Sequence, residues 1–480
     1  MPALTLVLLG LLFYVMVTQK GFKPTFKMLI VILLVSEIIF TYGGIVSVDG
    51  SGILHRSVFL QWCVIVYCFY GIIFKKVEIN ANILRFFFFA NIVFVILISI
   101  NLIFPYNGYI PQSIKSSPWD DYVLGLTHLV KFEANVSSIK VFLKVIGPAF
   151  LLLVAKSCFN NNDVYDILEQ TINWAKYNCF IGLAQFILAN LLGANDIFFK
   201  IRSFLIGPVT SSHSFVDAVR GNLIPITGLS EEPSHFVMSM YYFLVLMLIF
   251  FVCYNKKCTS NTRNKFKRYA ILAILLMFLS GGLSCIWYLF MLVVLFLILK
   301  VSIVNYKTKR TIFAKVTIVI SITLFVVSII WQLFASGYDG YYINRLKNVF
   351  LLIDYILSGQ ALFLYNILPL SEIARITSIV YTGNIFFDRP LVGLGITGFC
   401  AHDVTISMLA NFGLIGTAMW FFLAVYKKAP QVHYDLLFLI VFYFLGGLPI
   451  GTYERVISQF YFHFIVLTTA LYYKQDSFEI

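Results

Sequence analysis

Apolar stretches of nearly uniform length recur along the whole chain, separated by short polar turns. A hydrocarbon core about 30 Å thick is crossed by about 20 apolar residues in a helix. The pattern therefore predicts an all-α polytopic membrane protein, one integral membrane domain over residues 1–480, with about 13 (12–14) spans. The first span begins almost at Met1 without a basic segment before it, which favours a retained helix over a signal peptide. The predicted spans are 2–18, 28–47, 57–74, 86–105, 141–158, 173–193, 235–254, 269–283, 285–303, 316–335, 404–426, 434–450 and 458–473.

Composition narrows the class further. Of the 480 residues, 60% are hydrophobic and only 12% are charged, whereas an ordinary soluble domain carries about 25% charge. The mean hydropathy is +0.89. This composition excludes a disordered chain. It also argues against a soluble enzyme, because there are too few charges to cover the surface of soluble domains.

The excess of basic residues has a topological explanation. The formal net charge is +13, from 35 Lys and Arg against 22 Asp and Glu, and in a soluble protein this would suggest nucleic acid. Here the basic residues gather in alternate loops, such as 20–27, 75–85, 256–268 and 300–315. Cytoplasmic loops of membrane proteins carry this excess. We therefore expect an external N-terminus, a cytoplasmic C-terminus and no nucleic-acid partner.

Three external loops are long enough to hold a site: 106–140, 194–234 and 336–403. Long loops in compact proteins are usually functional or disordered, and these contain aromatic and apolar residues. Within the third, 346–370 is apolar enough to resemble another span. Its spacing favours an amphipathic helix at the membrane surface, since a true span here would reverse the topology of everything downstream.

The first candidate constellation lies just before the span at 235–254. Arg220, Glu231, Glu232 and His235 fall within 16 residues. Glutamate and histidine can accept protons, and arginine can grip a phosphate in a fork. The alternative is a charged loop at the membrane edge whose glutamates simply face solvent.

The second constellation precedes the span at 404–426. It contains Arg375, Arg389 and His402. Several arginines near one membrane surface suit a diphosphate, because arginine is always charged and binds phosphate bidentately. The alternative is anchoring of these side chains at the headgroups.

Other signals in the sequence carry less information. Residues 393–398 match G-x-G-x-x-G, but no strand and crossover helix surround them, so a glycine-rich turn for close backbone or ligand approach is favoured over a dinucleotide site. Glu37 within a span is either a functional ionisable residue or a neutral, hydrogen-bonded one. The eight cysteines show no metal spacing, and we predict neither a disulfide framework nor a metal or cofactor site.

These motifs resemble a known family. Arg220 with Gly228-Leu-Ser-Glu-Glu-Pro-Ser-His-Phe236 is similar to the Arg…Gly…Glu-Pro-Ser element of bacterial O-antigen polymerases (Wzy type). Arg375, Pro390-Leu-Val-Gly-Leu-Gly395 and His402 resemble an element shared by O-antigen polymerases and ligases. Asn411-Phe-Gly-Leu-Ile-Gly416 resembles the Gly-Leu-Ile-Gly sequence with which the family's next helix begins.

The resemblance implies a GT-C-like helical glycosyltransferase of the bacterial inner membrane that works at the periplasmic face. Its substrates would be undecaprenyl-diphosphate-linked oligosaccharide repeat units in the lipid, and a chain-length regulator protein is a further candidate partner. Arg220, Arg375 and Arg389 would hold the donor diphosphate, and Glu232 or His402 would accept the proton of the acceptor hydroxyl. Glu231 and His235 are further candidates, and no metal would be required.

Two other functions compete with this one. An O-antigen ligase would transfer the finished chain to lipid A-core, and the Glu-Glu-Pro-Ser element favours the polymerase over it. A transporter or flippase for a lipid-linked sugar would usually show repeated halves and ionisable residues in mid-membrane. Here the polar residues gather in external loops instead.

Overall fold

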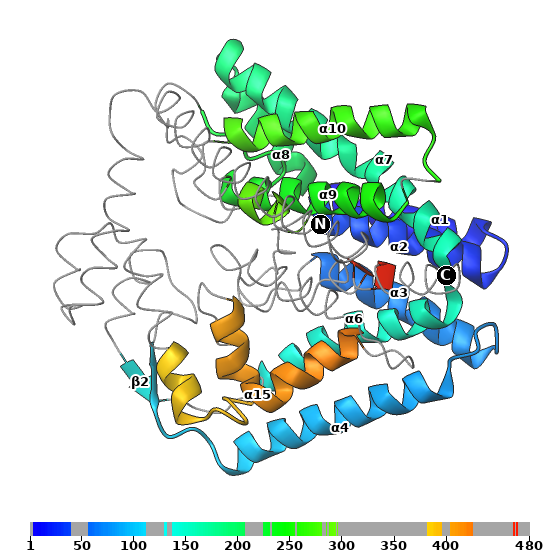
Figure 1. The fold of residues 1–480 in the computed structure, drawn as a ribbon. Helices are drawn as coiled ribbons and strands as arrows, with labels where there is room; N and C mark the ends of the chain where they lie inside the picture. The colour runs from blue at the N-terminus through cyan, green and yellow to red at the C-terminus, as the bar shows by residue number, and fades with distance from the viewer. Residues whose placement is uncertain are drawn as a thin grey trace, which may run out of the picture.

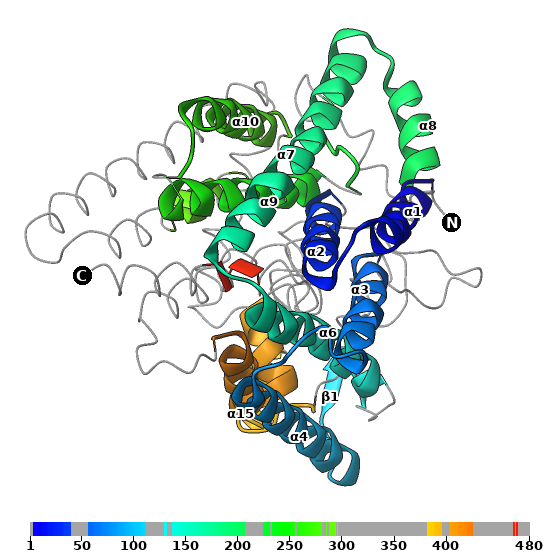
Figure 2. The same cartoon turned by 90° about the vertical axis from the view of Figure 1, so that its right-hand side faces the viewer.

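The structure is a computed structural model, and it describes just over half of the chain as a bundle of helices (Figures 1 and 2). The described residues are 3–39, 56–111, 129–131, 137–206, 224–230, 233–254, 257–280, 285, 288–293, 295, 382–395, 404–425, 464, 465, 467 and 468.

The described part is helical apart from one short ribbon. In chain order the helices are α1 (Ala3–Thr18), α2 (Phe22–Ile39), α3 (Arg56–Ile73), α4 (Ala81–Ile103), α6 (Ser137–Cys158), α7 (Asn161–Phe186), the π-helical turn η2 (Ile187–Leu191), α8 (Asn195–Ile206), α9 (Pro233–Cys253), α10 (Ser260–Leu279) and α15 (Val404–Val425). The ribbon pairs β1 (Tyr109–Pro111) with β2 (Leu129–Lys131) in antiparallel fashion, with Ile110 opposite Val130.

Most of these helices coincide with a predicted span, but some boundaries differ. The span predicted at 28–47 begins at Phe22 in α2, and the one predicted at 173–193 begins at Asn161 in α7. Both helices extend through charged residues, and Lys27 of α2 pairs with Asp166 of α7 at 2.6 Å where the two extensions meet. The predicted spans at 316–335 and 434–450, and the amphipathic segment 346–370, lie outside the described residues.

A helix also lies where the sequence predicts only a loop. The segment 194–234 contains α8, whose Phe198, Arg202 and Ile206 are buried while Ile197 and Phe204 are exposed. Residues four apart share a face of a helix, so α8 presents one face to the bundle. It packs against α1 and η2.

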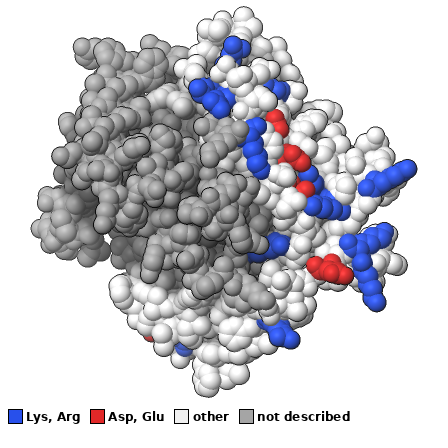
Figure 3. Space-filling model, turned by 45° about the vertical axis from the view of Figure 1, so that its right-hand side comes forward, with Lys and Arg blue, Asp and Glu red and all other residues white. Residues whose placement is uncertain are grey.

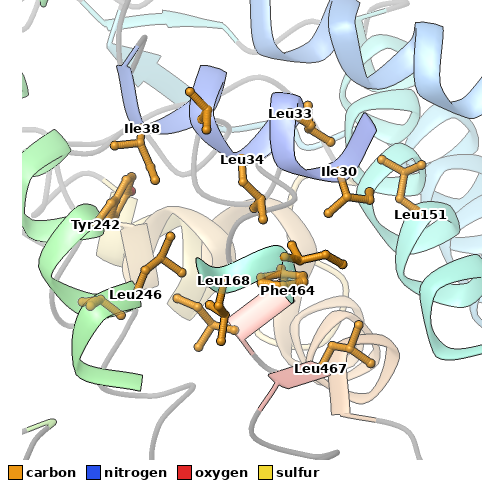
Figure 4. Close-up of a cluster of buried hydrophobic side chains, with 14 of the residues drawn as sticks. Ile30, Leu33, Leu34, Ile38, Leu151, Leu168, Tyr242, Leu246, Phe464 and Leu467 are labelled. Carbon is orange, nitrogen blue, oxygen red and sulfur yellow. The ribbon is translucent and has the colours of Figure 1, made fainter. Parts of the chain in front are cut away.

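The centre of the bundle is formed by α2, which packs against α3, α7 and α9. Every residue of α2 from Leu29 to Ile38 is buried, as expected for a stretch that is apolar on almost every side. Figure 4 shows Leu34 and Ile38 of α2 directed toward Leu168 of α7 and toward Tyr242 and Leu246 of α9.

The outside of the bundle is also apolar. On α4, Phe88, Phe89, Ile92 and Ile96 are each more than half exposed, and α1 exposes Phe13 in the same way. Soluble monomers rarely expose apolar patches of this extent. Two of the described helices are long and apolar enough to cross a membrane, Ala81–Ile103 and Pro233–Phe251. The surface thus favours association with lipid.

The two ends of the bundle differ in charge. The turns after α1, α3, α6 and α9 lie together at one end (Figure 1, right), and lysines and arginines gather there among a few carboxylates (Figure 3). The end of α4, the ribbon and residues 382–395 lie at the opposite end (Figure 1). The helices therefore separate the lysine-bearing turns from the segment that carries Arg389.

Candidate functional site

Two of the seven predicted site residues, His235 and Arg389, belong to the part of the chain that the structure describes. His235 lies in the first turn of α9 and is only 5% exposed. The other five lie outside the described residues: Arg220, Glu231, Glu232, Arg375 and His402. The structure thus shows the surroundings of the two motifs rather than their full set of charged groups.

Arg389 closes the end of α4. Its Nη1 donates to Asn101 Oδ1 at 3.0 Å and to the Phe104 carbonyl at 2.8 Å, and its Nη2 donates to the Pro105 carbonyl at 3.0 Å. The last carbonyls of a helix carry partial negative charge, and a cation near them is stabilising. Three of the five N–H donors of this guanidinium therefore go to α4 and the residues after it.

A tyrosine and a carboxylate lie beside this arginine. The Tyr106 hydroxyl donates to Asp388 Oδ2 at 2.7 Å, and the Arg389 guanidinium lies 5.8 Å from the centre of the Tyr106 ring. Burial, together with the hydrogen bond to Asp388, raises the pKa of Tyr106 to about 12. Tyr106 therefore stays neutral at physiological pH and acts here as a hydrogen-bond donor.

The glycine-rich turn that follows Arg389 packs against a break in α15. Gly413 has φ +62° and ψ −174°, which interrupts the helix. A Cβ on Gly393 would lie 2.5 Å from the Ala410 carbonyl oxygen and 2.6 Å from the Gly413 nitrogen. The two backbones are therefore in contact, which is the close approach predicted for a glycine-rich turn.

This contact satisfies the backbone groups that the break releases. Inside a membrane, an unpaired backbone N–H or carbonyl group is costly, so broken helices need partners from the protein. The turn provides them through four hydrogen bonds: Leu394 N to Ala410 O at 2.8 Å, Gly395 N to Asn411 O at 3.0 Å, Leu414 N to Pro390 O at 2.8 Å and Ile415 N to Leu391 O at 3.2 Å. The two motif segments thus form a single unit.

The first motif begins with a buried turn over residues 224–230, which is held from α7 and η2. Gln185 Oε1 accepts from Thr227 N at 2.8 Å and from Gly228 N at 2.7 Å. Asn190 Oδ1 accepts from Ile224 N at 2.7 Å, and its Nδ2 donates to Ile224 O at 3.1 Å. Two side-chain amides therefore replace the backbone partners that the turn lacks.

Arg202 is a residue of this site that the sequence interpretation missed. It is 1% exposed, and its Nη2 donates to the Ser230 carbonyl at 2.5 Å. A buried charge is costly unless it is paired or hydrogen-bonded. The sequence feature that could have identified Arg202 is its position on the same face of an amphipathic helix as Phe198 and Ile206.

A band of buried polar groups continues from this turn across the bundle. Asn178 Nδ2 donates to Ser239 Oγ at 2.6 Å, and the Ser239 hydroxyl donates to the Ile38 carbonyl. Next to Ile38, Glu37 Oε1 accepts from Gln61 Nε2 at 2.8 Å. Glu37 is therefore hydrogen-bonded within the bundle, as the second interpretation of this residue predicts, and Gln61 is a partner.

Within the described residues, no group of histidine, cysteine and carboxylate side chains could hold a metal ion. The seven cysteines described there are free thiols: Cys63, Cys68, Cys158, Cys179, Cys253, Cys258 and Cys285.

Comparisons with protein-family models, with curated proteins and with solved structures found no match for this chain. The likeness to O-antigen polymerases therefore rests on the three sequence motifs at 220–236, 375–402 and 411–416.

Proposed function

We propose that this chain is an O-antigen polymerase, a multi-pass glycosyltransferase of the bacterial inner membrane whose site faces the periplasm. In the reaction, the hydroxyl oxygen of one lipid-linked repeat unit forms a bond to the anomeric carbon of a glycan chain. The bond from that carbon to undecaprenyl diphosphate breaks, and the hydroxyl proton passes to a base. A diphosphate is a good leaving group, so the protein mainly has to neutralise charge and hold geometry.

The observation that supports this proposal best is the joining of two motif segments. The turn after Arg389 and the break in α15 are bonded to one another through their backbones. They lie at the end of the bundle opposite the lysine-bearing turns (Figure 1). If those turns are cytoplasmic, the motifs lie on the periplasmic side, as the reaction requires.

The proposed roles follow the residue chemistry. Arg220 and Arg375 hold the donor diphosphate, with Arg389 as a further contact through the donors that α4 does not use. Glu232 or His402 accepts the proton. The bundle supplies a lipid-facing path for the polyprenyl tail, and arginine charge takes the place of a metal ion.

Purified protein in lipid nanodiscs, given one defined undecaprenyl-diphosphate repeat unit, tests the proposal. We expect a ladder of longer products that persists in the presence of EDTA. Arg375→Ala should leave only single units, whereas Arg85→Ala, an exposed arginine in the first turn of α4 at the lysine-bearing end, should not change the ladder. A wild-type ladder from Arg375→Ala would contradict the assigned role.

The same assay separates the rival functions. A transporter would return only single units from purified protein, since longer products require an enzyme. A ligase would lengthen nothing until lipid A-core is added. In cells, deletion of a polymerase should leave lipopolysaccharide with core plus one repeat, whereas deletion of a ligase should leave core alone beside lipid-linked polymer.

A further inference from the structure

Gln185 is the most heavily used of the buried polar side chains around the turn at 224–230. It lies at the end of α7 and is 1% exposed. The Gln185 Oε1 atom accepts hydrogen bonds from the Thr227 and Gly228 backbone amides, and the Gln185 Nε2 group donates to Thr227 Oγ1 at 3.2 Å. The carboxamide thus binds the turn from both of its polar atoms.

The turn needs this support because its own backbone cannot provide it. Gly228 has φ +55°, and a Cβ there would lie 2.6 Å from the Phe236 ring. This tight, buried conformation directs two successive N–H groups toward α7. Buried N–H groups require acceptors, and Gln185 is the acceptor for both.

The turn leads directly into the two carboxylates of the first motif. Leu229 and Ser230 are buried at 2% and 0% exposure, and Glu231 and Glu232 come next. Pro233 then begins α9, whose Phe236 packs against Gly228. In the sequence, these two carboxylates alone separate the turn bound by Gln185 from the start of α9.

We propose that Gln185 is a positioning residue for proton transfer to Glu232, acting through the backbone of Thr227 and Gly228. This inference rests on the proposed glycosyltransferase function. Gln185 touches no substrate in this scheme. It determines where the segment that carries the proton acceptor begins, and a misplacement of about 1 Å can cost about 100-fold in rate.

The test uses the full chain in nanodiscs with the defined repeat unit. Gln185→Leu keeps the size but removes both polar atoms. Gln185→Glu, when protonated, presents the same accepting oxygen and a donating O–H. Asn91→Leu is the matched control, because among the described residues the Asn91 side chain bonds its own helix, donating to the Phe87 carbonyl at 2.7 Å. We expect Gln185→Leu to lower kcat about 100-fold with little change in KM.

Rescue distinguishes positioning from general stability. Compared with the wild type at the same pH, Gln185→Glu should recover most of kcat at pH 5.5, where its carboxyl group can be protonated. It should recover less at pH 8, where that group ionises. Asn91→Leu should match the wild type at both pH values. Amide hydrogen exchange of the turn is the second measurement. Thr227 and Gly228 should exchange faster in Gln185→Leu but not in Asn91→Leu, since only the first loses their acceptor.

The outcomes separate the two claims. A wild-type protein that makes no longer product overturns the proposed function. A wild-type protein that polymerises, with an equally active Gln185→Leu, overturns the positioning role alone. If Gln185→Leu fails to fold, Gln185→Asn takes its place, because it keeps both polar atoms but holds them one methylene farther from the Thr227 and Gly228 amides. Faster exchange of those two amides in Gln185→Asn with a kcat unchanged from wild type also overturns the positioning role.

Discussion

Replacing Gly413 by alanine should open the contact between the two motif segments. The residue has φ +62°, where a side chain is strained, and its Cβ would overlap the Leu391 carbonyl group and lie 2.6 Å from the Val392 nitrogen. These neighbours are backbone atoms of a tight turn rather than the ends of flexible side chains. The substitution therefore cannot be accommodated by a change of rotamer.

The expected cost combines two effects. Holding a non-glycine residue in a sparsely populated conformation costs of order 1–3 kcal/mol. Moving the turn away also breaks the adjacent bonds from Leu414 N to Pro390 O and from Ile415 N to Leu391 O, each worth about 1 kcal/mol. The contact should weaken by about 3–5 kcal/mol in total, which corresponds to at least about 100-fold in the local opening equilibrium.

Amide hydrogen exchange at Leu414 and Ile415 measures this opening directly. We expect at least about 100-fold faster exchange in Gly413→Ala. Gly383→Ala is the matched control, because a Cβ there meets nothing within 4 Å and its backbone is not left-handed. Equal exchange in the two variants would refute the account of the break as a strained, bonded contact.

Two further substitutions test the charged groups at the two ends of the bundle. Arg389→Leu removes the donors to Asn101, Phe104 and Pro105. The backbone amides in the last turn of α4 should then exchange at least about 100-fold faster. Arg389→Lys should restore only part of their protection, because one ammonium group cannot reproduce the forked guanidinium. Exchange unchanged in Arg389→Leu would contradict the closing role. At the other end, burial opposes ionisation of Asp163, but the Asn160 amide, Lys23 and Lys27 outweigh it and lower its pKa below the usual 3.8. Asp163→Asn should therefore destabilise the protein by about 1 kcal/mol at pH 7, and thermal melts should show this difference vanish as the pH falls below 3.8 through the folded pKa. A difference that does not shrink as the pH is lowered below 3.8 would contradict that reasoning.

Much of the helical architecture follows from the apolar pattern, because each span must satisfy its own backbone. The boundaries were less predictable where charged residues extend a helix. Lys23 and Lys27 were interpreted as loop residues, yet α2 begins at Phe22, and these lysines pair with Asp163 and Asp166 of α7. Such a pairing joins residues far apart in sequence, and a single sequence does not reveal it.

The candidate site was predictable in its motifs but not in its support. Asn178 and Gln185 are seven residues apart, hence on one face of α7, yet in the sequence they look like ordinary polar residues of a span. Their partners on α9 and in the turn at 224–230 lie 42 to 61 residues away. The function of these amides depends on that packing, which local spacing does not specify.

The arginines near the two motifs do not contribute equally to the proposed diphosphate site. Arg202 donates to the Ser230 carbonyl, and Arg389 commits three of its donors to the end of α4 and the residues after it. Both side chains thus have a structural role that removal would disturb before any substrate bound. Within the proposed mechanism, the charge that neutralises the diphosphate must therefore come mainly from Arg220 and Arg375. Loss of activity in Arg389→Leu alone would be weak evidence for phosphate contact, whereas loss in Arg375→Ala without faster exchange in α4 would be strong evidence.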